Sequence, residues 1–175
     1  MKTLLYLIVA TFLFSCKSEK LNPEIDMSAI GDSIPAQESW NAKIYFTDQG
    51  VLNAILHAEH ILVYSDQSKT YLEELNIDFY NSEEVKTTNL TSRRGRVNEI
   101  TKDMYAIEDV VAVSDSGVTL LTEELMWRNK DNKIVTDKFV TILTEDEKIE
   151  GYGFESDQSL SNYTIFEVTY QAYTK

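Results

Sequence analysis

The sequence predicts an all-β protein built from antiparallel strands. From Trp40 onward, runs rich in Tyr, Ile, Val, Phe and Thr alternate apolar with polar residues, and clusters of Asp, Asn, Ser, Gln and Gly separate them. No segment carries a 3.6-residue apolar stripe over about twelve residues, which an amphipathic helix would need. Together these observations favour a repetitive antiparallel sheet in which helices are marginal at most.

The N-terminus has the layout of an export signal. Lys2 precedes an apolar run over residues 4–14, and the small residue Ser15 closes it. The run has 11 residues, fewer than the ~20 that span a bilayer. The sequence Leu13-Phe14-Ser15-Cys16 resembles the lipobox of bacterial lipoproteins, in which the cysteine is acylated and becomes the first residue of the mature chain. The alternative is an ordinary signal peptide with an incidental cysteine.

These features predict a simple domain organisation. We expect a lipoprotein signal over residues 1–15, a lipidated Cys16 with a flexible tether up to residue 38, and one β domain over residues 39–175. The tether is polar and carries both prolines of the chain. Cleavage before Cys16 would leave 160 residues, which is enough for one domain with its own core. Acylation would use the only thiol, so the fold must rest on packing.

The charge of the chain restricts its partners. Formal charge is −13 at pH 7, and loss of Lys2 with the signal would make it −14. We expect no nucleic-acid partner, because that affinity comes mainly from Lys and Arg neutralising phosphates. The same charge disfavours tight binding of a phosphorylated lipid head group. A lipid would therefore bind through its tails.

Two alternating segments, residues 40–47 and 51–65, flank the turn sequence Asp48-Gln49-Gly50 and predict a hairpin. The alternation slips by one residue at Glu59-His60, which predicts a bulge or bend. The residues expected to share a face are Trp40, Ala42, Ile44 and Phe46 in the first segment, and Leu52, Ala54, Leu56 and Ala58 in the second.

A weak internal repeat supports stacked hairpins. "SDQSKTY" at residues 65–71 returns as "SDQSLSNY" at 156–163, and "NEITKDMY" at 98–105 and "NKDNKI" at 129–134 have the same form of a polar turn leading into a strand. One such hairpin cannot bury its apolar face alone, so neighbours should stack. Regular turn spacing in any all-β chain is the alternative explanation.

Motifs for catalysis or cofactor binding are missing, so we expect a protein that is not an enzyme and holds no metal or cofactor. His57 and His60 would face opposite sides of a regular strand and could not share a metal. The "GYG" at residues 151–153 lacks the further glycine and the helix of a phosphate loop, and no G-x-S-x-G elbow occurs.

Adjacent charges are also expected to be solvated. The pairs Glu73-Glu74, Glu83-Glu84 and Glu123-Glu124 would point to opposite faces of their strands, unlike the facing acid and base of a glycosidase. "RRGR" at residues 93–96 is interpreted as a solvated turn, with contact to a head-group phosphate as the alternative.

Several stretches resemble one family. The longest is residues 117–166, in which "LTEELMW", "TDKFV" and "GYGFESD" carry most of the likeness. Upstream, "FTDQGVLNAILHAEHILVY" and "SRRGRVNEITKDMYAIEDVVAVSDSG" look like preceding strands of the same family. Over roughly residues 36–167 the chain resembles the LptC family of lipopolysaccharide-export proteins, in the Bacteroidetes-type form that is a lipoprotein.

The resemblance implies an open, twisted antiparallel β-jellyroll of the LptA/LptC/OstA type, whose interior is a hydrophobic groove for lipopolysaccharide acyl chains. It implies that the protein receives lipid from an LptBFG-like inner-membrane ABC transporter and passes it to an LptA-like β-jellyroll protein by edge-strand pairing. It also implies a periplasmic protein, anchored through Cys16 to the inner membrane. Each exposed acyl CH₂ costs ~0.8 kcal/mol, so a covered path makes physical sense.

Thirteen apolar residues are expected to point inward and are candidates for the groove, although alternation does not distinguish a groove from an ordinary core. They are Leu56, Ile61, Val63, Leu75, Ile77, Phe79, Val111, Val113, Leu125, Trp127, Val140, Ile142 and Phe154.

Two other functions stay open at this point. One is a lipoprotein that only binds a partner as a scaffold, with a filled core and no groove. The other is a secreted hydrolase acting on glycans, which only the abundant carboxylates favour.

Overall fold

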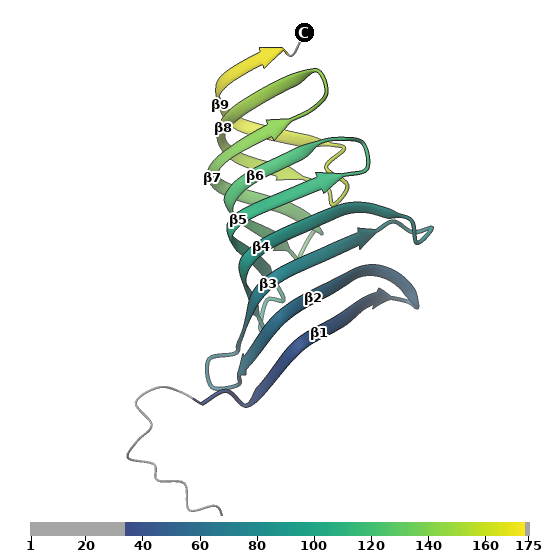
Figure 1. Ribbon diagram of the computed structural model, residues 1–175, viewed down its shortest axis with the longest axis vertical. Helices are drawn as coiled ribbons and strands as arrows, with labels where there is room; N and C mark the ends of the chain where they lie inside the picture. The colour runs from purple at the N-terminus through teal and green to yellow at the C-terminus, as the bar shows by residue number, and fades with distance from the viewer. Residues whose placement is uncertain (1–33, 174–175) are drawn as a thin grey trace, which may run out of the picture. The chain divides into compact units, whose positions relative to one another are not determined.

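The computed structural model describes residues 34–173, which form one sheet of nine antiparallel strands in sequence order (Figure 1). No helix occurs among these residues, so the all-β prediction is confirmed. The expected signal, Cys16 and most of the tether lie outside the described residues. The strands are β1 (Gln37–Asp48), β2 (Val51–Tyr64), β3 (Lys69–Tyr80), β4 (Lys86–Asn98), β5 (Met104–Ser114), β6 (Thr119–Arg128), β7 (Lys133–Leu143), β8 (Glu147–Ser156) and β9 (Tyr163–Tyr173).

Short turns join consecutive strands. β1 and β2 are connected by Gln49 and Gly50, with φ of 50° and 88°, which is the backbone that a tight two-residue hairpin requires. The four segments of the predicted repeat form the connections β2–β3, β4–β5, β6–β7 and β8–β9. In an antiparallel sheet these four connections share one rim, which we call the repeat rim.

Most strands break their alternation near the middle. In β5, Ala106 and Val110 are both buried, and between them Glu108 and Asp109 have φ of 66° and 50° and carry exposed charges. We call these positions the bend line. Its residues are Asn41 in β1, Glu59-His60 in β2, Glu73-Glu74 in β3, Arg93-Arg94 in β4, Glu108-Asp109 in β5, Glu123-Glu124 in β6, Asp137-Lys138 in β7 and Gly153 in β8.

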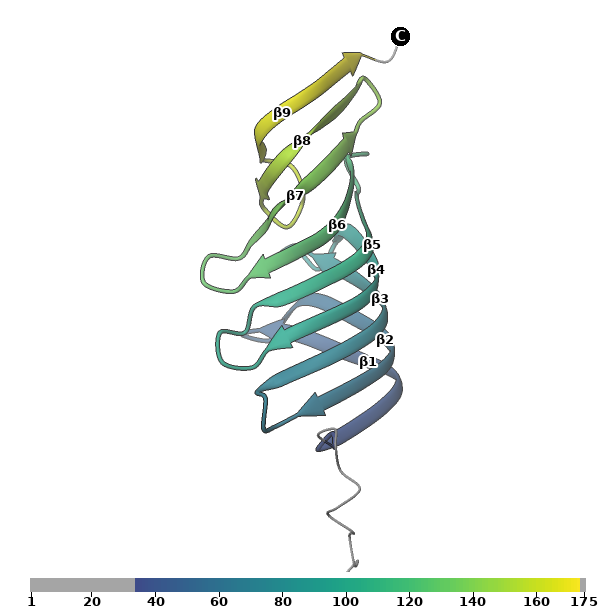
Figure 2. The same ribbon diagram turned by 90° about the vertical axis from the view of Figure 1, so that its left-hand side faces the viewer.

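The bends make each strand curve, so that its two halves face each other across an interior (Figures 1 and 2). The result is the open β-jellyroll expected from the sequence resemblance. The slip predicted at Glu59-His60 is confirmed, since Ala58 and Ile61 are both buried on either side of it.

The bends also correct three expectations. Trp40 does not share a face with Ala42, because the bend at Asn41 (φ 49°) lies between them and turns Trp40 outward, 63% exposed. His57 and His60 both lie on the outer face, since the inward residues are Ala58 before the bend and Ile61 after it. Glu73 and Glu74 are both exposed for the same reason.

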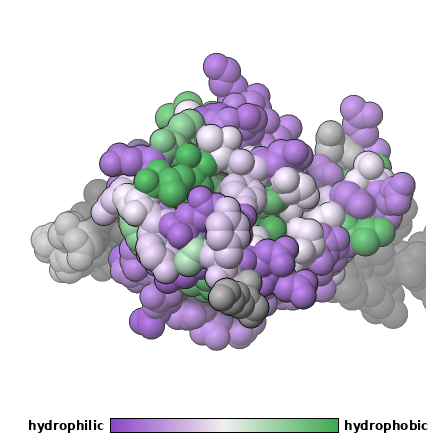
Figure 3. Space-filling model, turned by 90° about the horizontal axis from the view of Figure 1, so that it is seen from above, coloured by the Kyte–Doolittle hydropathy of each residue, from purple (hydrophilic) through white to green (hydrophobic). Residues whose placement is uncertain are grey.

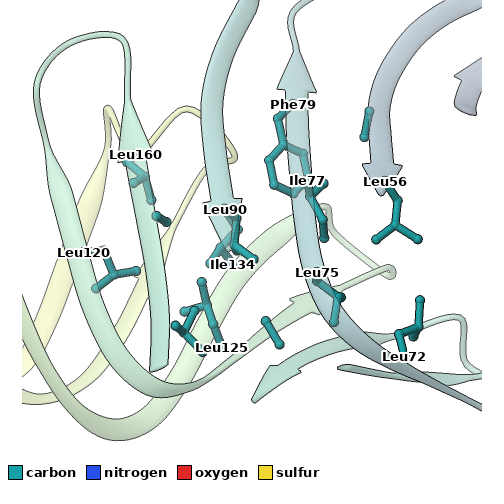
Figure 4. Close-up of a cluster of buried hydrophobic side chains, with 14 of the residues drawn as sticks. Leu56, Leu72, Leu75, Ile77, Phe79, Leu90, Leu120, Leu125, Ile134 and Leu160 are labelled. Carbon is teal, nitrogen blue, oxygen red and sulfur yellow. The ribbon is translucent and has the colours of Figure 1, made fainter. Parts of the chain in front are cut away.

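The inward side chains form continuous rows across the sheet. One row follows the register from Ile44 in β1 through successive partners to Ile149 in β8, and most of its members are buried (Figure 4). Its members are Ile44, Leu56, Ile77, Leu90, Ala112, Leu120, Ile142 and Ile149.

Both glycines of the "GYG" sequence are required by the local structure of β8. A Cβ on Gly151 would lie 2.3 Å from the backbone oxygen of Glu167, so only glycine lets β9 pack this closely on β8. Gly153 has φ of 71° and forms the bend of β8.

Candidate functional site

The interior contains a groove of about 920 Å³, within the ~300–1,000 Å³ of typical ligand pockets. Its walls are the inner faces of β1 to β5, completed by parts of β6 and β7. The lining is mainly apolar, with Leu72 and Ile61 from one half of the strands facing Ile77 and Phe79 from the other half. We refer to this space as the groove.

Eight of the thirteen predicted inward residues line the groove, with six of them buried. These eight are Leu56, Ile61, Val63, Leu75, Ile77, Phe79, Leu125 and Trp127. Val140, Ile142 and Phe154 also point inward, at 0–1% exposure, but they fill the interior and do not border the groove.

The inward placement of Val111 and Val113 is wrong. Val110 and Ala112 are buried at 1% and 0%, so alternation turns Val111 and Val113 to the outer face, and Val113 is 42% exposed. The bend at Glu108-Asp109 shifts the alternation of inward and outward residues in β5 by one position. If the bend is not recognised, the run "VVAV" at residues 110–113 is apolar at every position and does not show which residues point inward.

Several groove residues were not among the candidates. The predicted alternation already places Ala42, Ile44 and Phe46 on one face of the first strand, and Ala54 on the same face as the candidate Leu56 in the second. The positions in β4 and β5 had no comparable signal. The missed lining residues include Ala42, Ile44, Phe46, Ala54, Leu72, Leu90, Ala106 and Ile134.

One end of the interior is closed. The loop of residues 157–162 between β8 and β9 turns inward, and Leu160 at its tip is fully buried with φ of 58°. In Figure 4, Leu160 and Leu120 lie at one side of the apolar cluster, and Leu56 and Leu72 at the other. Gln158 of the same loop borders the groove, so the loop closes the groove on this side while Leu160 fills the core behind it.

Hydrogen bonds hold this loop in place. Thr88 Oγ1 in β4 donates to the Gln158 carbonyl oxygen at 2.8 Å, which ties the loop to a strand 70 residues away. Asp157 Oδ1 accepts from Ser159 Oγ at 2.8 Å and from the Ser161 amide at 3.0 Å. Burial alone would raise the pKa of Asp157, but hydrogen bonds from Asn162, Ser159 and nearby amides outweigh it and lower the pKa below its usual value.

The repeat rim of the groove is polar. Glu99 and Lys102 in the β4–β5 turn form an ion pair at 2.9 Å, and Thr70 Oγ1 donates to Glu99 at 2.8 Å. The hydrogen bonds from Lys102 and Thr70 lower the pKa of Glu99. Asn129 and Asn132 of the β6–β7 turn border the same end of the groove.

The outer face along the bend line carries charges that pair with one another. His60 bridges Glu38 at 2.8 Å and Glu73 at 3.1 Å, and its ring stacks on Trp40. The hydrogen bonds with Glu38 and then Glu73 raise the pKa of His60. A shallow polar depression of about 440 Å³ surrounds these residues.

The "RRGR" segment is part of β4 and not a turn, so that expectation is corrected. Arg93 pairs with Asp109 at 2.6 Å and Arg94 pairs with Glu108, and both ion pairs join bend-line residues of the neighbouring strands β4 and β5. Arg96 lies 4.3 Å from the centre of the Tyr105 ring. Glu83 and Glu84 lie in the β3–β4 turn and are exposed, as expected for solvated carboxylates.

Both outermost strands expose apolar side chains beside an unpaired backbone edge. On β9 the exposed residues include Phe166, Val168, Tyr170 and Tyr173, and on β1 they include Tyr45. Figure 3, viewed from the β9 end, shows apolar patches among hydrophilic side chains. Such edges are suited to pairing with a strand of another chain.

Within residues 34–173 no cluster of three or more His, Cys, Asp and Glu side chains is arranged to hold a metal ion. The same residues contain no helix of the length and hydropathy needed to span a membrane.

The comparison with protein families gives one match. A family model described as lipopolysaccharide-assembly, LptC-related, matches residues 4–173, which include every strand of the sheet. A comparison with curated proteins finds no match. The match covers nearly the whole chain and agrees with the all-β jellyroll. The chain therefore belongs to the LptC-related family of lipopolysaccharide-assembly proteins.

Proposed function

We propose that this protein is the periplasmic bridge component that accepts lipopolysaccharide acyl chains from an LptBFG-like inner-membrane ABC transporter and passes them to an LptA-like partner. One observation carries the proposal, namely the largely apolar groove of about 920 Å³ inside the sheet of an LptC-related chain. The protein binds and conveys lipid and performs no catalysis.

The groove supplies what an acyl chain needs. A ~12-carbon chain exposed to water costs on the order of 10 kcal/mol, which makes uncovered transfer slow. Leu56, Ile77 and Leu90 offer a continuous apolar wall that removes this cost. The net charge of −13 gives no general attraction for phosphate, so binding depends on the tails.

The two edge strands of the sheet can connect this protein to its partners. β1 has only β2 as a neighbour and β9 has only β8, so each leaves one row of backbone donors and acceptors unpaired within the sheet. A strand of the transporter or of the LptA-like protein can extend the sheet at either end and continue the groove across the junction. Acylated Cys16, following removal of residues 1–15, would keep the sheet at the inner membrane through the segment before β1.

Photo-crosslinking in cells tests the proposal directly. Phe46 and Tyr45 are neighbours on β1, but Phe46 lines the groove and Tyr45 points outward at 58% exposure. We expect a photo-reactive amino acid at residue 46 to form an adduct with lipopolysaccharide and the same amino acid at residue 45 to form none.

The two neighbouring positions control for expression, anchoring and proximity to the membrane. No adduct at residue 46 in a folded, membrane-bound protein would contradict lipid transport and favour the scaffold function. Equal adducts at both residues would also contradict a path through the interior.

A further inference from the structure

The loop of residues 157–162 differs from the other three connections on the repeat rim. Those between β2 and β3, β4 and β5, and β6 and β7 consist of exposed or half-buried residues, whereas Leu160 is 0% exposed. The sequence of the repeat contains the same difference, because "SDQS" is followed by Lys69 in the first copy and by Leu160 in the last. Of these four connections, the 157–162 loop therefore places an apolar side chain in the interior.

The 157–162 loop also crosses the interior. It leaves β8 at Ser156, which pairs with Ile134 beside the repeat rim. Its Gln158 carbonyl oxygen accepts from Thr88 Oγ1 at 2.8 Å, and Thr88 lies near the start of β4, towards the opposite rim. Gln158 borders the groove, and among the described residues none of β8 or β9 does. The loop thus stands between the groove and the last two strands.

Few contacts oppose an outward movement of this loop. The hydrogen bonds of Asp157 with Ser159 and Ser161 lie within the loop, so they can persist while it moves as a unit. Movement would break the bond from Thr88 and expose Leu160. Leu160 is also held at a φ of 58°, in the left-handed region that is unfavourable for leucine.

We propose that the 157–162 loop is a gate in the groove, closed in this structure, and that an acyl chain advancing from the β1 side displaces it to reach β9. The proposal rests on the proposed function and adds a conformational step to it. In the closed state a chain that enters beside β1 stops at Gln158. A chain that occupies the volume of Leu160 takes over its apolar contacts, so lipid entry offsets the exposure of this side chain.

The test uses the full chain with Cys16→Ser, which removes the only native thiol, and with Leu160→Cys. The rate of maleimide labelling at residue 160 is measured without ligand and with purified lipopolysaccharide. Val140→Cys in the same background is the matched control, because Val140 is also 0% exposed but belongs to β7. Lipid binding is followed separately with a photo-reactive amino acid at residue 46.

We expect lipopolysaccharide to raise the labelling rate at residue 160 about tenfold or more, because a buried thiol reacts only during rare openings of the loop. The rate at residue 140 should not change, since β7 keeps its neighbours β6 and β8. In the chain that retains Leu160, lipopolysaccharide should speed hydrogen exchange of the amides in residues 157–162 and leave the β7 amides protected. This second measurement decides the question if Leu160→Cys fails to fold.

An adduct at residue 46 without faster labelling of residue 160 or faster exchange of the loop would overturn the gate and leave the proposed function intact. Rapid labelling and exchange of the loop without ligand would also overturn it, because the loop would then be open at rest. Equal acceleration at residues 140 and 160 would do the same, since the whole sheet would then loosen. No adduct at residue 46 would instead count against the proposed function, and with it the gate.

Discussion

The two ends of the sheet use the same inward rows in different ways. Phe46 in β1 and Phe154 in β8 both point to the interior, yet Phe46 is 37% exposed and borders the groove, whereas Phe154 is 1% exposed within a filled core. The β1 and β2 rows contain small residues such as Ala42, Ala54 and Ala58, and the opposite end has an inserted loop with Leu160. Side-chain size and this loop therefore decide which part of the jellyroll is hollow.

A matched pair of substitutions should show the largest difference between the two ends. Phe154→Ala removes a fully enclosed ring and should lower the free energy of unfolding by about 3–5 kcal/mol. Phe46→Ala should lower it by only about 1–2 kcal/mol, because much of that ring already contacts solvent. Urea denaturation followed by tryptophan fluorescence measures both, and equal losses would show that the ends are packed alike.

The junction of β8 and β9 allows a second comparison. Gly151→Ala places a Cβ against the Glu167 backbone oxygen and should cost about 1–3 kcal/mol as β9 is displaced. Gly117→Ala is the control, since its φ of 87° strains alanine but no atom lies in the way. The hydrogen-exchange rate of the β9 amides distinguishes the two variants, because only Gly151→Ala should raise this rate. Unchanged protection of the β9 amides in Gly151→Ala would contradict the close packing of β9 on β8.

The loop that closes the filled end should be sensitive to one hydroxyl. Thr88→Val keeps the shape of the side chain and removes the donor to the Gln158 carbonyl oxygen, which should cost about 1 kcal/mol. Limited proteolysis within residues 157–162 should become faster. Thr87→Val, at the half-buried neighbouring residue, is the matched control, and equal cleavage of both variants would rule out this role for Thr88.

The smallest expected effect is at the hollow end and depends on pH. The pKa of His60 is raised by Glu38 and Glu73, so its contribution to stability is fully present below the unfolded pKa of about 6.5 and is lost as pH rises through the folded pKa. The stability difference between wild type and His60→Gln should therefore shrink from pH 5.5 to pH 9. His57→Gln is the matched control, and a difference that does not change with pH would contradict a charge-dependent contribution of His60 to the pairing with Glu38 and Glu73.

The sequence itself contains a signal for the bends. Pairs of adjacent charges occur in the middle of β3, β4, β5, β6 and β7, and each lies on the bend line. A regular strand would bury one member of each pair, whereas a bend exposes both. The alternation expected from the sequence has a bend only at Glu59-His60, with Glu73-Glu74 and Glu123-Glu124 on unbroken strands and Arg93-Arg94 in a turn. The bend at Glu108-Asp109, which turns Val111 and Val113 outward, is not predicted.

The sequence by itself determined the all-β class, the antiparallel hairpins and the four turns of the repeat, because alternation and turn chemistry are local properties of the chain. It also determined the LptC resemblance, because the family motifs are short stretches of sequence. Only the tertiary structure decided which inward residues border a groove and which fill a core. That distinction depends on the distance between two halves of bent strands and on the loop that carries Leu160, and neither is encoded in the period of any one strand.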